Sequence, residues 1–345
     1  VDLTESYKSL IEALNHAGHL KADILVVFNH NEMSISPSVG ALSHYLSKMQ
    51  SSPVYNRLRN GIEAALKKSP HIGRFMLPRV RKLEEIAKGL LVPGMFFEEL
   101  GFRYFGPLDG HNLEQLTENL KNIINLPGPK VLHVVTVKGK GYTPAEQDAE
   151  SFHSAGRFSV SNGDFCSKAA CSYTDVLRSH LTECAGNDSR VVAVTAAMEK
   201  GTGLDGFRER FPERFFDVGI AEQHAVSFAG GMSRQGTKPV VAIYSTFLQR
   251  AYDQLMQDVA LQGFDAVFCL DRAGLVGEDG PTHHGAFDLA YMRTIPGSIV
   301  MAPGYREDME AMLAFAIENK GLYSIRYPKD TVLDIPLRNP LALGK

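Results

Sequence analysis

The sequence of 345 residues lacks several features that would each have assigned it to a class of protein. It contains no tryptophan, and its four cysteines, at positions 166, 171, 184 and 269, include no CxxC pair. Such spacing gives little support to a zinc site or a disulfide framework, so a reducing cytoplasm fits best. No apolar run approaches the roughly 18 residues that span a bilayer, which excludes a membrane-spanning protein.

The sequence also lacks an excess of charge of either sign. It contains 36 Lys and Arg and 39 Asp and Glu, which give a net charge of −3. A near-neutral chain argues against nucleic acid or a membrane surface as the partner. The first residues, VDLTESYKSL, contain neither an initiator Met nor the basic and apolar regions of a signal peptide, so we expect a cut or partial chain.

Short apolar runs alternate with stretches of helical period, a pattern typical of parallel strands buried on both faces. The predicted strands are 23–29, 131–138, 190–197, 214–220, 238–245, 266–272, 298–303 and 322–328. The predicted helices are 8–17, 112–125, 173–185, 221–235, 246–261 and 305–318. We therefore expect an α/β fold, whose ligands bind outside the carboxyl ends of the strands.

Two segments interrupt this alternation. Residues 51–90 are basic and have helical but no strand periodicity, so we interpret them as an insertion that forms a solvated or mobile lid; they lack the interleaved aromatics of a nucleic-acid patch. Residues 149–172 are rich in Ser, Gly and other small residues and predict a linker between two α/β units.

The run from Gly201 to Gly206 formally satisfies GxGxxG, which can cradle the pyrophosphate of a dinucleotide. No acidic residue ends a strand about 20 residues later, since Asp217 comes too early. A plain loop between strand and helix is the favoured interpretation, and a nucleotide-dependent oxidoreductase is kept as a distant alternative. There is no GxSxG or HExxH motif.

Polar or aromatic residues follow three successive predicted strands. Glu222 opens a helix rich in Gly and Ala, either as a charge favoured by the helix dipole or as a buried carboxylate suited to proton exchange. The next loop brings Tyr244, Phe247 and Arg250, and the third brings Asp279 and His283 among several glycines. The three strand ends converge in space if the sheet is parallel. Their convergence strengthens the case for a functional role of the residues at all three ends.

At residues 174–330 the strings AEQHAV, YSTFLQRAYDQ, DRAG, THHGAFDL and IRYP resemble the pyrimidine-binding domain of transketolase-like thiamine-diphosphate enzymes. They are most similar to the 1-deoxy-D-xylulose-5-phosphate synthase family. At residues 11–148 the strings EALNHAG, NHNEMSIS, VPGMFFEELGFRYFGPLDGHN and KGKGYTPAE resemble the second half of that family's diphosphate-binding domain. The resemblance runs nearly end to end and implies two parallel-sheet domains with helices on both faces.

What the resemblance implies is a transferase that condenses pyruvate with D-glyceraldehyde 3-phosphate to 1-deoxy-D-xylulose 5-phosphate with loss of CO2, in the isoprenoid-precursor pathway. Thiamine diphosphate and Mg2+ are the implied cofactors, and a cytoplasmic homodimer is expected. By resemblance Glu222 contacts the aminopyrimidine ring, and His153 and His283 stabilise charge or move protons at the reacting centre.

The remaining site residues also come from the resemblance. The implied cofactor contacts are Asn31, Tyr142, Glu222, Phe247 and Tyr244. The implied substrate contacts are Tyr244, Arg250, Asp279 and Arg326. A guanidinium suits both a carboxylate and a phosphate, and the amide oxygen of Asn31 suits Mg2+.

The family's Gly-Asp-Gly motif is altered here, because Asp2 keeps the spacing of 29 residues before Asn31 while Val1 and Leu3 replace the glycines. A Leu at this point should crowd a phosphate, so metal binding by Asp2 is the least supported of these expectations. We expect residues 1–148 to be a partial diphosphate-binding domain, 149–172 a linker, 173–335 the pyrimidine-binding domain and 336–345 the start of a further linker to an absent third domain.

Three interpretations of the altered start stay open. The chain is a fragment of a synthase, which we favour, or one subunit of a split enzyme, or a degenerate relative that binds without catalysing. The last two make the chain a non-catalytic binding or assembly partner.

Overall fold

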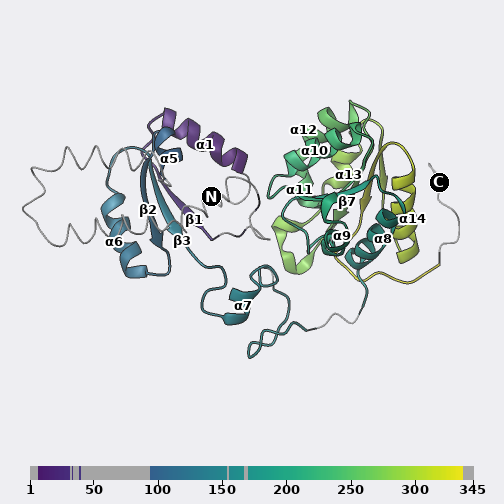
Figure 1. The fold of residues 1–345 in the computed structure, drawn as a ribbon, viewed down its shortest axis with the longest axis horizontal. Coiled ribbons are helices and arrows are strands. Elements are labelled where there is room, and N and C mark those ends of the chain that lie inside the picture. The colour runs from purple at the N-terminus through teal and green to yellow at the C-terminus, as the bar shows by residue number, and fades with distance from the viewer. Residues whose placement is uncertain are drawn as a thin grey trace, which may run out of the picture. The chain divides into compact units, whose positions relative to one another are not determined.

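The computed structural model describes residues 7–31, 33, 39, 94–153, 155–166 and 170–336. The chain forms two compact units, of which the first ends at Ala149 and the second begins at Glu150 (Figure 1). All strand pairs in both sheets are parallel, which confirms the predicted α/β fold class. Asp2 and the predicted insertion at 51–90 lie outside the described residues.

The first unit contains a three-stranded sheet in the order β1-β3-β2. Its strands are β1 (Leu25–His30), β2 (Arg103–Asp109) and β3 (Lys130–Val135), and its helices are α1 (Tyr7–His19), α5 (Met95–Glu99), α6 (Leu113–Ile123) and α7 (Thr143–Gln147). Leu14 of α1 and Phe97 of α5 are buried with Val131 on one face of the sheet. Ile123 of α6 is buried with Leu132 on the other face. The sheet is therefore covered on both sides, as its apolar strands require.

Strand β2 was not among the predicted strands. Its sequence, RYFGPLD, contains Gly106 and Pro107, and the register against β3 shifts between Phe105 and Leu108. Gly and Pro are depleted inside strands because one weakens the strand and the other cannot donate to the ladder. Pairing with β3 on one side is what keeps this irregular segment extended.

The second unit is built on a six-stranded sheet in the order β5-β4-β6-β7-β9-β8. The strands are β4 (Val191–Thr195), β5 (Phe215–Asp217), β6 (Lys238–Tyr244), β7 (Ala266–Asp271), β8 (Ser298–Met301) and β9 (Leu322–Arg326). The longer helices are α8 (Tyr173–Asn187), α10 (Glu222–Arg234) and α14 (Arg306–Glu318), and the shorter ones are α9 (Asp205–Arg210) and α13 (Asp288–Met292).

Successive residues of each central strand point to opposite faces of the sheet, so each strand contributes side chains to two hydrophobic cores. Val240 and Ala242 of β6 are buried with α8, α9 and α14, for example with Leu177. Val241 and Ile243 are buried with α10 and α13, for example with Met292. Strands β4, β6 and β7 are buried along their whole length, which explains why they read as continuous apolar runs.

The helix predicted over 246–261 is confirmed as a helical segment, but it is irregular: four short helical pieces of different type follow one another without a gap. They are α11 (Ser245–Leu248), the 3-10 turn Gln249–Ala251, α12 (Tyr252–Gln254) and a π-helical turn at Leu255–Ala260. The wide π turn lets Asp258 accept a hydrogen bond from Ser227 of α10. A Cβ at Gly230 of α10 would lie 2.7 Å from the carbonyl oxygen of Asp258, so the two helical segments pack closely at this point. This close packing, and not the sequence periodicity, accounts for the irregular geometry of the segment.

Among the described residues, no helix combines the length and the apolar character that crossing a bilayer demands.

Candidate active site

The carboxyl ends of adjacent strands β6 and β7 carry an aromatic group in the second unit. The Tyr244 and Phe247 rings stack with centroids 5.5 Å apart, and the His283 ring meets Phe247 edge to face at 5.3 Å. Tyr244 is buried, and burial raises the pKa of its hydroxyl. Flat faces of this kind can hold a flat ring, and the parallel sheet brings these three predicted residues together as expected.

Arg272 completes this group, although we had assigned it no role. Its guanidinium lies 3.7 Å from the centroid of the Tyr244 ring and donates from Nη1 to the carbonyl oxygen of Gly201 at 3.0 Å. It follows β7 directly with a backbone φ of 60°, a left-handed conformation that is costly for a residue with a Cβ. Such backbone strain persists only where the surrounding structure holds the residue in place. In the sequence, the one signal that could have identified Arg272 as a site residue was its position directly after a predicted strand.

Asp279 stands between two cations. Its Oδ2 accepts from Nε of Arg272 at 3.1 Å, and its Oδ1 accepts from Nζ of Lys329 at 2.5 Å. Burial works to raise the pKa of Asp279, but the hydrogen bond and charge of Lys329, followed by Arg272, lower it overall. Arg272 also contacts the buried carboxylate of Asp271, so two cations face two carboxylates here, and the donors of Arg272 and Lys329 are what would suit an anionic ligand.

Glu222 is the first residue of α10, and its side chain is only 2% exposed. Its Oε2 lies 3.0 Å from Nη1 of Arg250, so the arginine that we expected in the substrate pocket is paired with the expected catalytic carboxylate. A carboxylate can accept from more than one donor, so this ion pair is compatible with a further hydrogen bond to a ligand. The helix terminus also favours negative charge here.

Arg326, at the end of β9, is held by a carboxylate that we had not singled out. Its Nε donates to Oδ2 of Asp288 at 2.7 Å, and Asp288 is only 1% exposed. A planar guanidinium has five donors, so this pairing does not by itself exclude an anionic substrate.

The loop with the GxGxxG pattern is filled by the protein itself. A Cβ on Gly201 would lie 2.0 Å from the Tyr244 hydroxyl, and one on Gly203 would lie 2.7 Å from the carbonyl oxygen of Thr174. The helix that follows, α9, has only six residues. These glycines permit close packing around Tyr244, and we do not propose a dinucleotide site.

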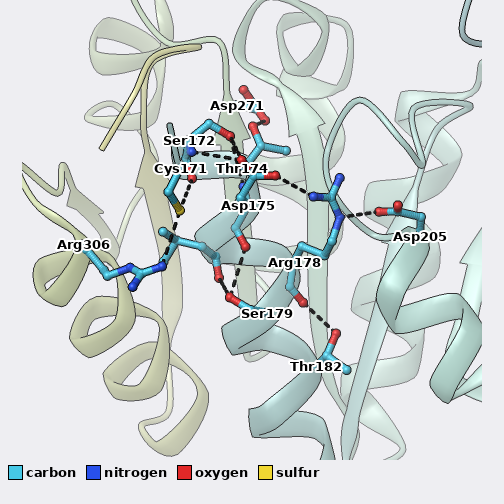
Figure 2. A network of polar contacts seen from close by, with 11 residues as sticks. Cys171, Ser172, Thr174, Asp175, Arg178, Ser179, Thr182, Asp205, Asp271 and Arg306 are labelled. Atoms are coloured by element: carbon cyan, nitrogen blue, oxygen red, sulfur yellow. Dashed lines mark hydrogen bonds and ion pairs between the residues drawn. The ribbon is translucent and has the colours of Figure 1, made fainter. Parts of the chain in front are cut away.

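A cleft of about 760 Å³ opens beside Arg272 and Asp279 within the second unit. Its other charged walls include Arg178, Lys200 and Lys329. The start of α8 forms one wall, where Ser172 and Asp175 cap the helix reciprocally (Figure 2).

The wall of the cleft is linked by hydrogen bonds to the sheet. Figure 2 shows the hydroxyl of Thr174 donating to Oδ2 of the fully buried Asp271 at 2.8 Å, and Arg178 bridging Asp175 and Asp205. Oδ1 of Asp271 in turn lies 3.2 Å from Nη1 of Arg272. Arg272 is thus paired with Asp271, whose carboxylate is itself hydrogen-bonded to Thr174 of α8.

Two family models match the chain. The one described as "Transketolase, pyrimidine binding domain" matches residues 169–333, and the one described as "1-deoxy-D-xylulose-5-phosphate synthase" matches residues 8–136. The chain belongs to the 1-deoxy-D-xylulose-5-phosphate synthase family. The resemblance seen in the sequence is thereby confirmed.

Curated relatives are similar along almost the whole chain. The 1-deoxy-D-xylulose-5-phosphate synthase of Carboxydothermus hydrogenoformans is 51% identical over 326 residues, which cover 94% of this chain and 52% of the relative. The 1-deoxy-D-xylulose-5-phosphate synthase 1 of Geobacter sulfurreducens is 51% identical over 332 residues, which cover 96% of this chain and 52% of the relative. The chain thus spans about half the length of the curated relatives it matches.

Solved structures give weaker matches. A chain titled "Split gene transketolase, inactive beta4 tetramer" matches with a TM-score of 0.46 and 25% identity, over 51% of this chain and 58% of the other. The transketolase of Campylobacter jejuni matches with a TM-score of 0.46 and 15% identity, over 94% of this chain and 55% of the other.

The remaining predicted site residues of this synthase-family chain are His153 in the second unit and Tyr142 and Asn31 in the first. His153 is exposed in the segment that starts the second unit, where Lys200 contacts Glu150 at 3.4 Å. In the first unit Tyr142 is the residue before α7, and Oδ1 of Asn31 accepts from the backbone N–H of Met33 at 3.0 Å. The roles predicted for these three residues stay predictions.

Possible metal ligands of four residue types can be examined within the described part of the chain. No group of three or more His, Cys, Asp or Glu side chains in that part could hold an ion. Asn31 is therefore the one predicted metal ligand whose surroundings are described, since Asp2 lies outside.

Proposed function

We propose that the protein containing this chain is a thiamine-diphosphate-dependent transferase that condenses pyruvate with D-glyceraldehyde 3-phosphate to 1-deoxy-D-xylulose 5-phosphate, releasing CO2. The observation that carries the proposal is the buried carboxylate of Glu222 at the first turn of α10. The proposal draws its reaction from the family to which the chain belongs. A cytoplasmic homodimer that uses Mg2+ is part of the same proposal.

The residues of the second unit fit a flat, charged cofactor. Glu222 would hold the aminopyrimidine by a hydrogen bond to a ring nitrogen, because a buried carboxylate interacts strongly with a donor in a low dielectric. Tyr244 and Phe247 would offer their faces to the ring. The bound cofactor would act as the electron sink for loss of CO2.

The cations near the sheet edge fit the two substrates, which are small anions. Arg272 is held by the carboxylates of Asp271 and Asp279, and Lys329 contacts Asp279 as well. We assign the Arg272 and Lys329 donors to substrate binding and the His283 imidazole to hydrogen bonding or proton movement at the reacting atoms. Asn31 would contribute an amide oxygen to Mg2+.

The test combines cofactor binding with turnover in the full-length protein. Thiamine diphosphate with Mg2+ should raise the melting temperature, since a ligand at 100 times its Kd stabilises by about 2.7 kcal/mol. Glu222→Gln should lower the rate of pyruvate-dependent CO2 release by about 100-fold to 10,000-fold, the range for a lost acid–base group. Glu213→Gln, which changes an exposed glutamate of the same unit, is the matched control and should leave the rate unchanged.

Turnover of Glu222→Gln at the wild-type rate would contradict the assignment of Glu222. No rise in melting temperature with the cofactor would instead favour the alternative that the protein is a non-catalytic binding or assembly subunit.

A further inference from the structure

Residues 137–142 form the loop that joins β3 to α7, at the carboxyl end of the middle strand of the first sheet (Figure 1). Parallel sheets bind their ligands beyond this end of the strands. The loop contains Tyr142, the predicted cofactor contact, and two glycines, Gly139 and Gly141, whose φ angles are 80° and 100°. Glycine adds little stiffness to a loop, so the shape of this one depends on bonds from other parts of the unit.

His111 supplies one of these bonds from the segment that follows β2. Its Nε2 accepts a hydrogen bond from the backbone N–H of Val137 at 2.8 Å, across 26 residues of the chain. A backbone N–H can only donate, so Nε2 must offer its lone pair and the neutral ring must carry its proton on Nδ1. The bond therefore requires one particular tautomer of His111.

The backbone around His111 is held by contacts of its own. The N–H of His111 donates to Oδ1 of Asp109 at 2.9 Å, and the N–H of Gly110 donates to the carbonyl oxygen of Val135 at 2.8 Å. A Cβ on Gly110 would lie 2.5 Å from a methyl carbon of Val134, so the chain runs in close contact with β3 here. His111 is thus placed beside the end of β3, although its side chain is exposed.

The start of the loop is also bonded to the other neighbour of β3. The hydroxyl of Thr136 donates to Oδ1 of Asn29 at 2.8 Å, and the N–H of Thr136 donates to the carbonyl oxygen of His30 at 3.0 Å. Asn31, the predicted Mg2+ ligand, is the next residue after His30. These bonds set the loop from the β1 side, and the bond from His111 sets it from the β2 side.

From Val137 the geometry extends to Tyr142 through two overlapping turns. The carbonyl oxygen of Val137 accepts from the N–H of Lys140 at 3.2 Å, and that of Gly139 accepts from the N–H of Tyr142 at 3.1 Å. Each turn takes its direction from the residues before it, so a displacement of Val137 moves Tyr142 as well.

We propose that His111 is a positioning residue: by accepting the N–H of Val137, it sets residues 137–142 in the conformation that presents Tyr142 to thiamine diphosphate. His111 acts through Val137 and does not itself contact the cofactor. The inference rests on the proposed function, in which the cofactor is thiamine diphosphate, and on the predicted role of Tyr142.

The first measurement uses the full-length protein without cofactor. Hydrogen exchange of the Val137 amide should be faster in His111→Leu by about 3-fold to 10-fold, the range for loss of one hydrogen bond. His111→Gln should restore slow exchange, because its Oε1 can accept in place of Nε2. His16→Leu, at an exposed histidine of α1, is the matched control and should leave the exchange unchanged.

The tautomer of His111 gives an independent signature. In protein labelled with 15N at its histidine rings, NMR should show Nε2 of His111 without a proton, and the resonance is identified by its absence in His111→Gln. Because the side chain is exposed, its replacement leaves no cavity in the core, and melting temperatures check that each variant is folded.

The second measurement is the binding of thiamine diphosphate with Mg2+ by calorimetry. His111→Leu should raise the Kd of the cofactor by about 3-fold to 10-fold, and His111→Gln should return it to the wild-type value. In turnover assays the apparent KM for the cofactor should rise by the same factor in His111→Leu, whereas kcat at saturating cofactor should be retained, since the lost contact serves binding.

If the wild type binds the cofactor and His111→Leu binds it equally well, the proposal is overturned. An equal rise of the Kd in His16→Leu, no rescue by His111→Gln, or a proton on Nε2 would overturn it too. A wild type that does not bind thiamine diphosphate contradicts the proposed function instead, and the role of His111 toward the cofactor fails with it. Exchange of the Val137 amide then still reports whether the hydrogen bond holds the loop.

Discussion

The two sheets of the chain use histidine and charge in opposite ways. In the first unit His133 is buried, and its ring lies 5.6 Å from that of His30 and 5.0 Å from that of Phe28. In the second unit His283 lies at the edge of the sheet beside an ion network. The comparison teaches that a histidine surrounded by strands serves packing, whereas one placed beyond the strand ends can meet a ligand.

Central strands of the second sheet, β6 and β7, also differ in burial from β1, which lies at an edge of the first sheet. Every residue of β6 and β7 is buried, whereas Val27 of β1 is 50% exposed. Burial of both faces in the second unit gives a rigid base for the loops that carry the site.

The largest effect should come from the core of the second unit. Phe268→Ala, at a fully buried position of β7, should lower the free energy of unfolding of that unit by about 3–5 kcal/mol. Val27→Ala should cost less than about 1 kcal/mol in the first unit, because half of the side chain is already in water. Urea unfolding followed by hydrogen exchange of peptides from β7 and β1 measures both. Equal losses would remove the contrast in burial between the sheets.

Removing a buried ion pair from the second unit should cost more stability than removing an exposed ion pair from the first. Asp288→Ala leaves Arg326 partly buried without its partner and should cost about 3–5 kcal/mol. Asp23→Ala is the comparison in the first unit, where the carboxylate that pairs with Lys130 is 73% exposed, so water can replace much of the lost interaction. Thermal unfolding of each variant tests this, and a larger loss for Asp23→Ala would reverse the expected order.

The buried histidine of the first unit should make stability depend on pH. Burial, followed by the charge of His30, lowers the pKa of His133 to about 4 from its ordinary value of 6.5. The unfolded chain therefore binds this proton more readily, so stability is complete above about pH 6.5 and falls by about 3 kcal/mol as the pH drops to about 4. His133→Phe should flatten that dependence in denaturant titrations at pH 4 to 7. An unchanged slope would mean that His133 titrates normally in the folded unit.

A smaller effect than that of the buried histidine concerns the glycine that packs against the site. Gly201→Ala should cost about 1–3 kcal/mol, because the new Cβ would lie 2.0 Å from the Tyr244 hydroxyl. In a Tyr244→Phe background the same substitution should cost less, since the crowding atom is gone. A double-mutant cycle on melting temperature gives the coupling. Additive losses would show that Gly201 is not packed on Tyr244.

Several strands and helices could be predicted because their signal is local. The apolar runs of β4, β6 and β7, the N-terminal cap of α8 and the helical extent of α8 and α14 appear in the sequence as they do in the fold. Strand β2, which was not predicted, and the irregular helical geometry over Ser245–Ala260 depend on neighbours: β3 pairs with the first and α10 packs on the second. The strand-end rule found Tyr244, Phe247 and His283, which the structure brings into contact.

The sequence by itself determined the α/β class, the family strings and the candidate residues at the strand ends, because each depends on residues close together in the chain. Tertiary structure alone decided which charges pair: Arg250 with Glu222, and Lys329 with Asp279 across 50 residues. Coulomb energy depends on separation in space and on burial, and neither quantity is written in the spacing of residues along a chain. Arg272, held between Asp271, Asp279 and the Tyr244 ring, could be recognised only once the sheet had placed all of them.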